Sequence, residues 1–456
     1  MHCDLQIALA KAKYDAGDGK YREAVFAAAA SARAAGDGAR LARAALVLAS
    51  GGGTSDAILD PELVELLEEA LTAVGEEETS LRARVLSGLA VELQWGREVD
   101  RRMQLGREAL ALAREIGDPE VLGLVLARSW ALVDGSRPYG DELESLMDEA
   151  AAVAREASDL GALASAVGNK AFLAGRRGDG VAFAANLAEA ARINDGLRRP
   201  VCTWMDRNDA AALAAFTGDL EHAEQLATEA VELGRLAGRP DDSIIGSFGA
   251  LLFQIRGAQG RSDELIPLLE ARIVAAPDVP TWRLALAGAL VESDRVDEAR
   301  EHYFWLADDG CANVPRDIEY SVSMGGLALW SYAVRPPESI LRDVYERFSP
   351  WAGNFSWTGP TIMHPSDHGL AMAASALQQP DVADGHFADA VALCERAGAR
   401  VYLAHAHYDW AHVLADRGDA AGAREHASIA LDLGTQIGMD GPHGVVPRAQ
   451  SLLAAL

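Results

Sequence analysis

One local pattern recurs along this chain: a helical stretch, a Gly-Asp turn, and a second helical stretch with alanine at a fixed offset. The turn at Gly218 is followed by alanine five residues later, at Ala223, and the turn at Gly418 is followed in the same way by Ala423. Glycine can end a helix in the left-handed conformation without a Cβ clash, and the aspartate after it can cap the next helix. The small alanine lets two helices approach closely. The pattern therefore predicts antiparallel helix pairs.

The same five-residue offset reappears elsewhere, which indicates an array. It joins Gly19 to Ala24, Asp294 to Ala299 and Gln378 to Ala383. After Gly178 and Gly260 the same position holds a larger residue, Phe183 and Leu265 respectively. Second helices are predicted to begin near residues 20, 60, 98, 141, 180, 219, 261, 295, 338, 381 and 419. This spacing, mostly about 38 to 43 residues, exceeds the 34 of a tetratricopeptide repeat. We predict an all-α, right-handed superhelical solenoid of roughly 10 or 11 tetratricopeptide-like helix pairs.

Composition narrows the class of partner. Alternating β-branched and aromatic runs bounded by Asn-Gly turns are missing, so little or no sheet is predicted. The chain has 41 Lys and Arg against 68 Asp and Glu, a formal net charge of −27. Such a surface repels phosphate backbones and anionic lipid, so we expect no direct nucleic-acid or membrane partner. The simpler interpretation of the acidity is that it keeps a large helical protein soluble.

The cysteines bear on the compartment. Cys3, Cys202, Cys311 and Cys394 are far apart and form no C-x-x-C pair, which argues against a disulfide framework or a zinc knuckle and suits a reducing compartment. No run of 18 apolar residues and no signal-peptide pattern is present, so we expect a cytoplasmic protein.

One region departs from the repeat. From about Asp308 to Ser366 the chain holds six prolines and a dense set of aromatic residues. Proline interrupts helices, so we predict a loop-rich joint where the superhelix bends. The predicted organisation is an N-terminal helical-repeat lobe over 1–306, the joint over 307–366, and C-terminal repeats over 367–456, with one continuous solenoid as the alternative. A Gly-rich insertion over 49–56 is predicted to be a surface loop.

The aromatic joint supplies the predicted ligand site. In a superhelix of this kind the first helix of each pair lines the concave face, and aromatic rings with a few polar groups are typical of a pocket. The predicted ligand-binding residues are Trp282, Arg283, Tyr303, Trp305, Arg316, Asp317, Tyr320, Trp330, Trp357 and His368. In the alternative interpretation these rings are core at a bent joint, and Arg316 and Asp317 cap the following helix.

Histidines concentrate near the C-terminus. On one predicted helix, His405, Asp409 and His412 stand at i, i+4 and i+7, on one face, where two imidazoles and a carboxylate could bind Zn²⁺ or Fe²⁺. The H-E-x-x-H spacing is absent, and the alternative is a polar helix face on which Asp409 pairs an arginine such as Arg417. We favour the alternative and predict no metal and no cofactor.

A second histidine pair, His364 and His368, stands in a proline-broken turn. We interpret this segment as a helix start capped by Ser366 or Asp367. No G-x-S-x-G nucleophile motif occurs anywhere in the chain, so no catalytic residue is predicted.

Several long stretches resemble the C-terminal helical region of large actinobacterial signalling ATPases. These families are the large ATP-binding LuxR-type transcription regulators and AAA-type proteins fused to class III nucleotide cyclases. The resemblance is carried by RRPVCTWMDRNDAAALAAFTGDLEHAEQLATEAVELGRLAG within Arg198 to Tyr320, by Gly359-Pro360 through His368-Gly369, and by FADAVALCERAGARVYLAHAHYDWAHVLADRGD after it; residues 4–50 look like the first repeats of that region. It implies a sensor or partner-binding arm.

The family's other activities do not carry over. The chain has no G-x-x-x-x-G-K-[ST] loop; Gly19-Lys20-Tyr21 is the nearest fragment. No basic helix-turn-helix follows the last repeat and no cyclase domain is present. We therefore predict a non-catalytic recognition or sensor module that binds a protein, peptide or small-molecule effector in a bacterial signalling or transcription-regulatory system. The alternatives are a fragment of a multidomain ATP-binding regulator and a helical-scaffold enzyme with a His-rich site; a homodimer is left open.

Overall fold

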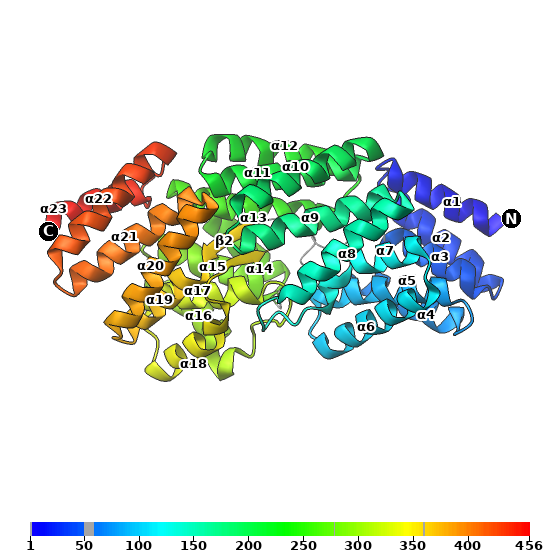
Figure 1. Ribbon diagram of the computed structural model, residues 1–456, viewed down its shortest axis with the longest axis horizontal. Coiled ribbons are helices and arrows are strands. Elements are labelled where there is room, and N and C mark those ends of the chain that lie inside the picture. Colours follow the sequence, from blue (N-terminus) through cyan, green and yellow to red (C-terminus); the bar gives the residue numbers. More distant parts are fainter. Residues whose placement is uncertain (1, 50–58, 278, 359–360) are drawn as a thin grey trace.

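The chain folds as an all-α solenoid of tetratricopeptide-like helix pairs (Figure 1). The computed structural model describes residues 2–49, 59–277, 279–358 and 361–456; the predicted insertion over 49–56 lies outside these ranges except for Ala49. The first helices of the pairs are α1 (His2–Asp15), α3 (Gly38–Leu48), α5 (Thr79–Glu92), α7 (Pro119–Ala127), α9 (Leu160–Arg176), α11 (Pro200–Thr217), α13 (Asp241–Gln259), α15 (Pro280–Glu292), α17 (Tyr320–Val334), α19 (Ser366–Ala376) and α21 (Arg400–Asp416). The second helices are α2 (Tyr21–Ala34), α4 (Pro61–Val74), α6 (Val99–Ile116), α8 (Asp141–Ala157), α10 (Gly180–Leu197), α12 (Leu220–Leu236), α14 (Ile266–Ala275), α16 (Val296–Cys311), α18 (Glu338–Phe348), α20 (Pro380–Ala397) and α22 (Ala420–Ile437).

Within the described ranges these helices make eleven pairs, and a final helix, α23 (Val445–Ala455), follows them. Each second helix begins within a residue of its predicted start, with one exception. The exception is α14, where a 3₁₀ turn, η4 (Ser262–Leu265), comes first. Three further 3₁₀ turns are η2 (Leu93–Trp95), η3 (Ser129–Leu132) and η5 (Ser349–Trp351).

The turn chemistry follows the repeat pattern. Gly218 and Gly418 take the left-handed conformation, with φ of 96° and 83°, and Asp219 and Asp419 accept hydrogen bonds from backbone amides of the next helix. The alanines at the offset, Ala223, Ala299, Ala383 and Ala423, are fully buried where the paired helices touch. The first pair is the exception, because its left-handed residue is Gly17 rather than Gly19, and Ala24 is only half-buried.

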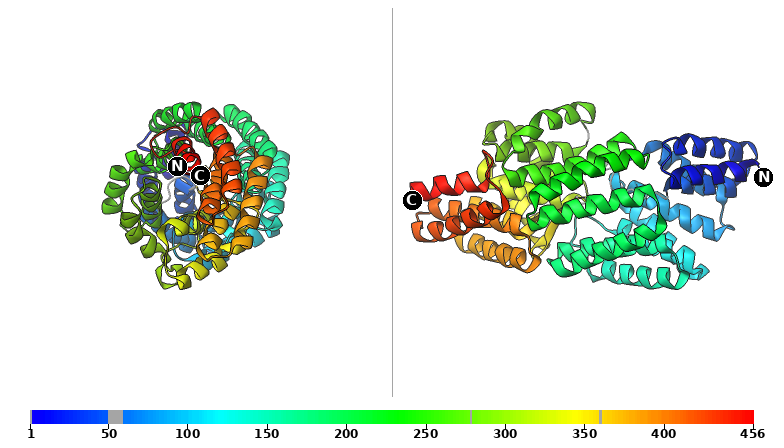
Figure 2. Two further views of the ribbon diagram at one scale, coloured as in Figure 1. Left: turned by 90° about the vertical axis from the view of Figure 1, so that its left-hand side faces the viewer. Right: turned by 90° about the horizontal axis from the view of Figure 1, so that it is seen from above.

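Helices form a ring when the molecule is seen along its long axis (Figure 2), and successive superhelical turns touch. Arg316 pairs with Asp134 across 182 residues of sequence, and Arg396 donates to the carbonyl of Arg177 across 219. Repeats in an open solenoid contact only their neighbours. Contacts between turns therefore make this superhelix tight, and its inner surface is enclosed.

A two-stranded antiparallel hairpin, β1 (Phe355–Thr358) and β2 (Thr361–Pro365), lies inside the ring. It contacts the first helices α9, α11, α13, α17, α19 and α21. Phe355 and Ile362 are buried, and the carbonyl of Ile362 accepts hydrogen bonds from Gln254 on α13 (3.1 Å) and Tyr402 on α21 (2.9 Å). The prediction of little or no sheet is confirmed, because in the described residues this short hairpin is the one sheet, and it fills the interior.

The predicted loop-rich character of the joint is largely wrong, because α17, α18, η5 and the hairpin occupy most of it. Three of the six prolines stand where a helix starts: Pro337 is the N-cap of α18, Pro350 lies in η5, and Pro365 is the N-cap of α19. A missing amide hydrogen costs nothing at these positions. Pro360 lies outside the described residues. The three-part division of the chain stays a prediction.

Candidate functional site: a histidine-lined cavity

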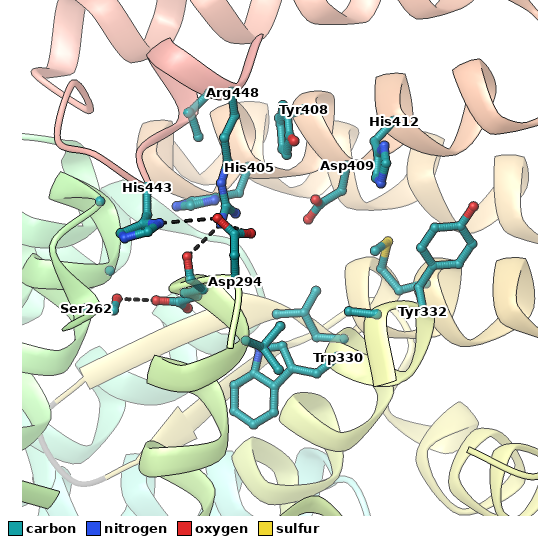
Figure 3. Close-up of a pocket in the computed structure, with 18 of the residues that line it drawn as sticks. Ser262, Asp294, Trp330, Tyr332, His405, Tyr408, Asp409, His412, His443 and Arg448 are labelled. Atoms are coloured by element: carbon teal, nitrogen blue, oxygen red, sulfur yellow. Dashed lines mark hydrogen bonds and ion pairs between the residues drawn. The ribbon is translucent and has the colours of Figure 1, made fainter. Parts of the chain in front are cut away.

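A cavity of about 700 Å³ opens inside the C-terminal part of the superhelix (Figure 3). Its walls come from α13, α15, α17, α19 and α21, from η4, β2 and the start of α16, and from α23 with the loop before it. Five of these helices, α13, α15, α17, α19 and α21, are first helices of their pairs. The cavity therefore lies on the concave side of the superhelix, where first helices also contact the hairpin.

One wall is a face of α21. His405, Tyr408, Asp409 and His412 all line the cavity (Figure 3). They stand at i, i+3, i+4 and i+7, so the helical period places them on one side of the helix. The predicted common face of His405, Asp409 and His412 is confirmed.

Asp409 pairs with a histidine from the neighbouring helix. Nε2 of His368, on α19, lies 2.9 Å from Oδ2 of Asp409. Burial raises the pKa of this carboxyl, but the His368 hydrogen bond and the nearby imidazoles outweigh burial and hold the pKa below its ordinary value. Arg417 instead pairs with Asp384, at 2.6 Å. The predicted Asp409–Arg417 pair is therefore wrong, since Asp409 lies on the inner face of α21.

Two neighbouring imidazoles, those of His405 and His364, lie in surroundings that disfavour their charged form. Burial lowers the pKa of His405 to about 4, and it lowers the pKa of His364 well below the ordinary value for histidine. His364 ends up beside the cavity because the hairpin strand β2 carries it into the ring. Its ring centre lies 4.9 Å from that of Tyr402.

The wall opposite α21 carries the indole ring of Trp330, which packs into space left by two glycines. Trp330, on α17, packs where Gly288 and Gly326 leave room: a Cβ on Gly288 would lie 2.4 Å from Cζ2 of the indole, and one on Gly326 would lie 3.0 Å from Cη2. Tyr332 stands beside it and donates to Asp416 at 2.6 Å. The cavity is thus apolar and aromatic on the α17 side and polar on the α21 side.

The last helix closes one side of the cavity. Asp294, in the turn after α15, lies 3.3 Å from Nδ1 of His443 and accepts a hydrogen bond from Arg448 at 3.1 Å (Figure 3). Arg448 also donates to the carbonyl of Glu292 at 2.6 Å. Burial raises the pKa of the Glu292 carboxyl, which accepts from Ser262. These bonds hold α23 against α15, although the two helices are remote in sequence.

Of the ten residues predicted to bind a ligand, Trp330 and His368 line this cavity. Trp357 lies instead beside a small apolar void between α8, α9 and the hairpin. Trp282 packs under Arg272, and Arg283 stacks on Trp305 with the guanidinium 4.7 Å from the ring. The structure does not bring these last residues to the cavity.

The other four predicted residues also lie away from it. Tyr303 is fully buried and donates to the carbonyl of Leu327. Arg316 forms the inter-turn ion pair with Asp134. Asp317 and Tyr320 are buried near the same junction. The alternative interpretation, that much of this aromatic set is core, describes their surroundings well.

Asp367 does not cap α19 and neither does Ser366, because the N-cap is Pro365 and makes no side-chain bond. Instead, Asp367 is buried, and it accepts from the amide of Gly353 and contacts Nδ1 of His386 at 2.8 Å. Nε2 of His386 meets the hydroxyl of Tyr345 at 3.0 Å. The predicted cap is therefore wrong, and the carboxylate ties α19 to α20 and to the loop before the hairpin.

Several cavity residues were not predicted. Glu292, Asp294, Tyr408 and Arg448 line it, but they stand at ordinary helix-end and helix-face positions in the sequence. The concentration of histidines near the C-terminus was the one usable signal. It did not reveal that His364 and His368 lie beside His405, because that proximity depends on the hairpin.

Comparisons with known proteins concern the fold alone. No protein-family model and no curated protein matches the sequence. Similar solved structures include the Cut9–Hcn1 hetero-tetramer of the APC/C, at 13% identity and TM-score 0.48, covering 100% of this chain and 95% of that one. Another is Naa15/Naa10 bound to HypK-THB, at 14% identity and TM-score 0.23, covering 95% of this chain and 64% of that one. A circular tandem repeat protein matches at 14% identity and TM-score 0.13, covering 99% of this chain and 94% of that one.

These low scores say nothing about what this chain binds. None of the three is a LuxR-type regulator, so that finer resemblance remains an interpretation of the sequence. None of the helices in the described ranges is long and apolar enough to cross a bilayer.

Proposed function

We propose that this chain is a recognition module that holds an effector in the histidine-lined cavity. The observation that carries the proposal is the cavity itself, about 700 Å³ on the concave side of the solenoid. Ligand pockets commonly have volumes of roughly 300–1,000 Å³ and combine apolar walls with a few polar groups. The aromatic α17 wall and the polar α21 wall fit that description, and Trp330 and His368 belong to both the predicted site and this one.

The effector is a peptide, a segment of a partner protein or a small molecule, in a bacterial signalling or transcription-regulatory system. The resemblance to sensor arms of LuxR-type and cyclase-linked ATPases supports this setting. The charge of −27 disfavours nucleic acid as a direct partner. The cysteines, Cys3, Cys202, Cys311 and Cys394, are free thiols and are buried, which suits the proposed cytoplasmic location.

Ligand screening against two kinds of variant tests the proposal. Native mass spectrometry of the chain as expressed, followed by a thermal-shift screen of small molecules and peptides, identifies binders. Tyr408→Ala truncates the cavity wall, whereas Arg283→Ala alters the predicted site outside the cavity. We expect binding to be weakened at least tenfold by Tyr408→Ala and to survive Arg283→Ala. Ligands whose affinity is unchanged in Tyr408→Ala but abolished in Arg283→Ala would place the site at the aromatic joint instead.

A second candidate function is an enzyme on a helical scaffold. The His368–Asp409 pair favours it, because a carboxylate that orients an imidazole is a common arrangement in general acid–base catalysis. An effector that is chemically altered by the wild-type chain and unchanged by His368→Gln would establish this reaction. An effector recovered intact from both would support recognition without catalysis.

A further inference from the structure

Three imidazoles from three separate elements meet at the polar end of the cavity. His364 is the penultimate residue of β2, His368 lies in the first turn of α19, and His405 lies on α21. The ring centre of His364 is 6.0 Å from that of His368 and 6.3 Å from that of His405. Two imidazoles on one tetrahedral zinc ion have ring centres about 5 Å apart. Small side-chain movements would therefore bring His364 to the spacing of a shared metal with either neighbour.

The hydrogen bonding of His368 leaves one ring nitrogen available. An ionised carboxylate has no proton to give, so the Asp409 contact assigns the hydrogen to Nε2 of His368. Its Nδ1 is buried, and it has no hydrogen-bond partner in the described structure; the same holds for Nδ1 of His364. A buried polar atom left without a partner costs about 1–3 kcal/mol. A carboxylate that fixes the tautomer of a metal-binding histidine is a common outer-shell arrangement.

We propose that His364, His368 and His405 bind a divalent transition-metal ion of the zinc class, with Asp409 as the positioning residue for His368. Three imidazoles leave a fourth coordination position, which faces the cavity. The effector of the recognition module then carries a metal-binding group such as a carboxylate or thiolate. This step deepens the proposed function and rests on the same cavity.

The ligand atoms need to turn to converge. In the described part of the chain the one group whose ligand atoms already lie within 4.8 Å of one another is Asp367, His386 and Asp389. Both nitrogens of His386 are engaged there, with Asp367 and with Tyr345. At the proposed site a half-turn of the His364 or His405 imidazole about its Cβ–Cγ bond moves Nδ1 by about 2 Å and Nε2 by about 1 Å, and that torsion is soft. The hydrogen-bonded cluster is therefore the competitor that the experiment must exclude.

The experiment is a titration of the full-length, chelator-treated chain with Co²⁺ and Zn²⁺. Binding is followed by the visible absorption of four-coordinate Co²⁺, by calorimetry and by metal analysis. We expect one ion per chain, at least tenfold weaker binding in His405→Asn, and about 10- to 100-fold weaker binding in Asp409→Asn. Asp389→Asn and the exposed His222→Asn should bind as the wild type does.

Circular dichroism of each metal-free variant shows whether it is folded, and His405→Gln serves as a second variant if His405→Asn is not. A wild-type chain that binds no Co²⁺ or Zn²⁺ overturns the proposal. Metal binding that is lost in Asp389→Asn, or that survives both His405 variants and Asp409→Asn, also overturns it. An effector that binds the cavity in the presence of chelator leaves the recognition function standing without the metal. Metal binding by a chain that retains no effector would support the metal site and leave the recognition function unsupported.

Discussion

Replacing Gly288 by alanine tests the packing of the cavity wall. Gly288 lies inside α15, and its missing side chain makes room for Trp330: an added Cβ would lie 2.4 Å from Cζ2 and 2.7 Å from Cη2 of the indole, and 3.0 Å from Cζ of Phe253. Carbon atoms prefer separations of about 3.5–4.0 Å. The ring cannot retreat easily, because Gly326 meets it at similarly short range.

Two opposing contributions set the change in the free energy of unfolding caused by Gly288→Ala. Alanine in a helix interior is favoured over glycine by about 0.5–1 kcal/mol because it reduces the entropy of the unfolded chain. Overpacking a core contact costs about 1–3 kcal/mol. An overlap of more than 1 Å with a ring held on both sides belongs in the upper half of that range, about 2–3 kcal/mol. After subtraction of the alanine gain, we expect Gly288→Ala to lower the free energy of unfolding by about 1–2.5 kcal/mol.

The matched control is Gly168→Ala. Gly168 lies inside α9, and nothing stands within 4 Å of its added Cβ. The same substitution should therefore stabilise the protein by about 0.5–1 kcal/mol. Urea unfolding followed by far-ultraviolet circular dichroism measures both. In a Trp330→Phe background, which lacks the clashing ring atoms, the penalty of Gly288→Ala should shrink by about 1 kcal/mol or more. Gly288→Ala that stabilises as much as Gly168→Ala would refute the reasoning.

Three further predictions concern charge, core and partner. Burial, followed by the charge of Glu319, raises the pKa of Asp317 to about 7 from 3.8. The folded state thus holds this proton more tightly than the unfolded chain, and the stabilisation is lost as pH rises from about 4 through 7. The melting temperature of Asp317→Asn should therefore fall less over this pH range than that of the wild type. Equal slopes of melting temperature against pH in the two proteins would contradict the assignment. Phe355→Ala empties a fully buried hairpin position and should cost about 3–5 kcal/mol in urea unfolding, against less than about 0.5 for the exposed Val274→Ala. At physiological salt a gel shift should show no DNA or RNA binding at low micromolar protein, because the net charge is −27.

The sequence alone determined the helix pairs. Glycine at 218 and 418, a capping aspartate after each, and a small residue five positions on are local requirements of a helix–turn–helix unit. Each is satisfied within about 20 residues of chain, so their recurrence predicts nearly every second-helix start. The common face of His405, Asp409 and His412 is equally local, because it follows from the helical period.

Only the tertiary structure decided what these faces meet. The course of the superhelix is the sum of many small packing angles, which no short motif encodes. That sum brings Asp294 to Arg448 and lets β2 carry His364 into the ring beside His368. It also turned the aromatic, proline-rich segment into helices and an interior hairpin, because proline at a helix start is compatible with the helix that follows. The histidines were visible in the sequence, but their meeting at one cavity depends on contacts between residues far apart in the chain.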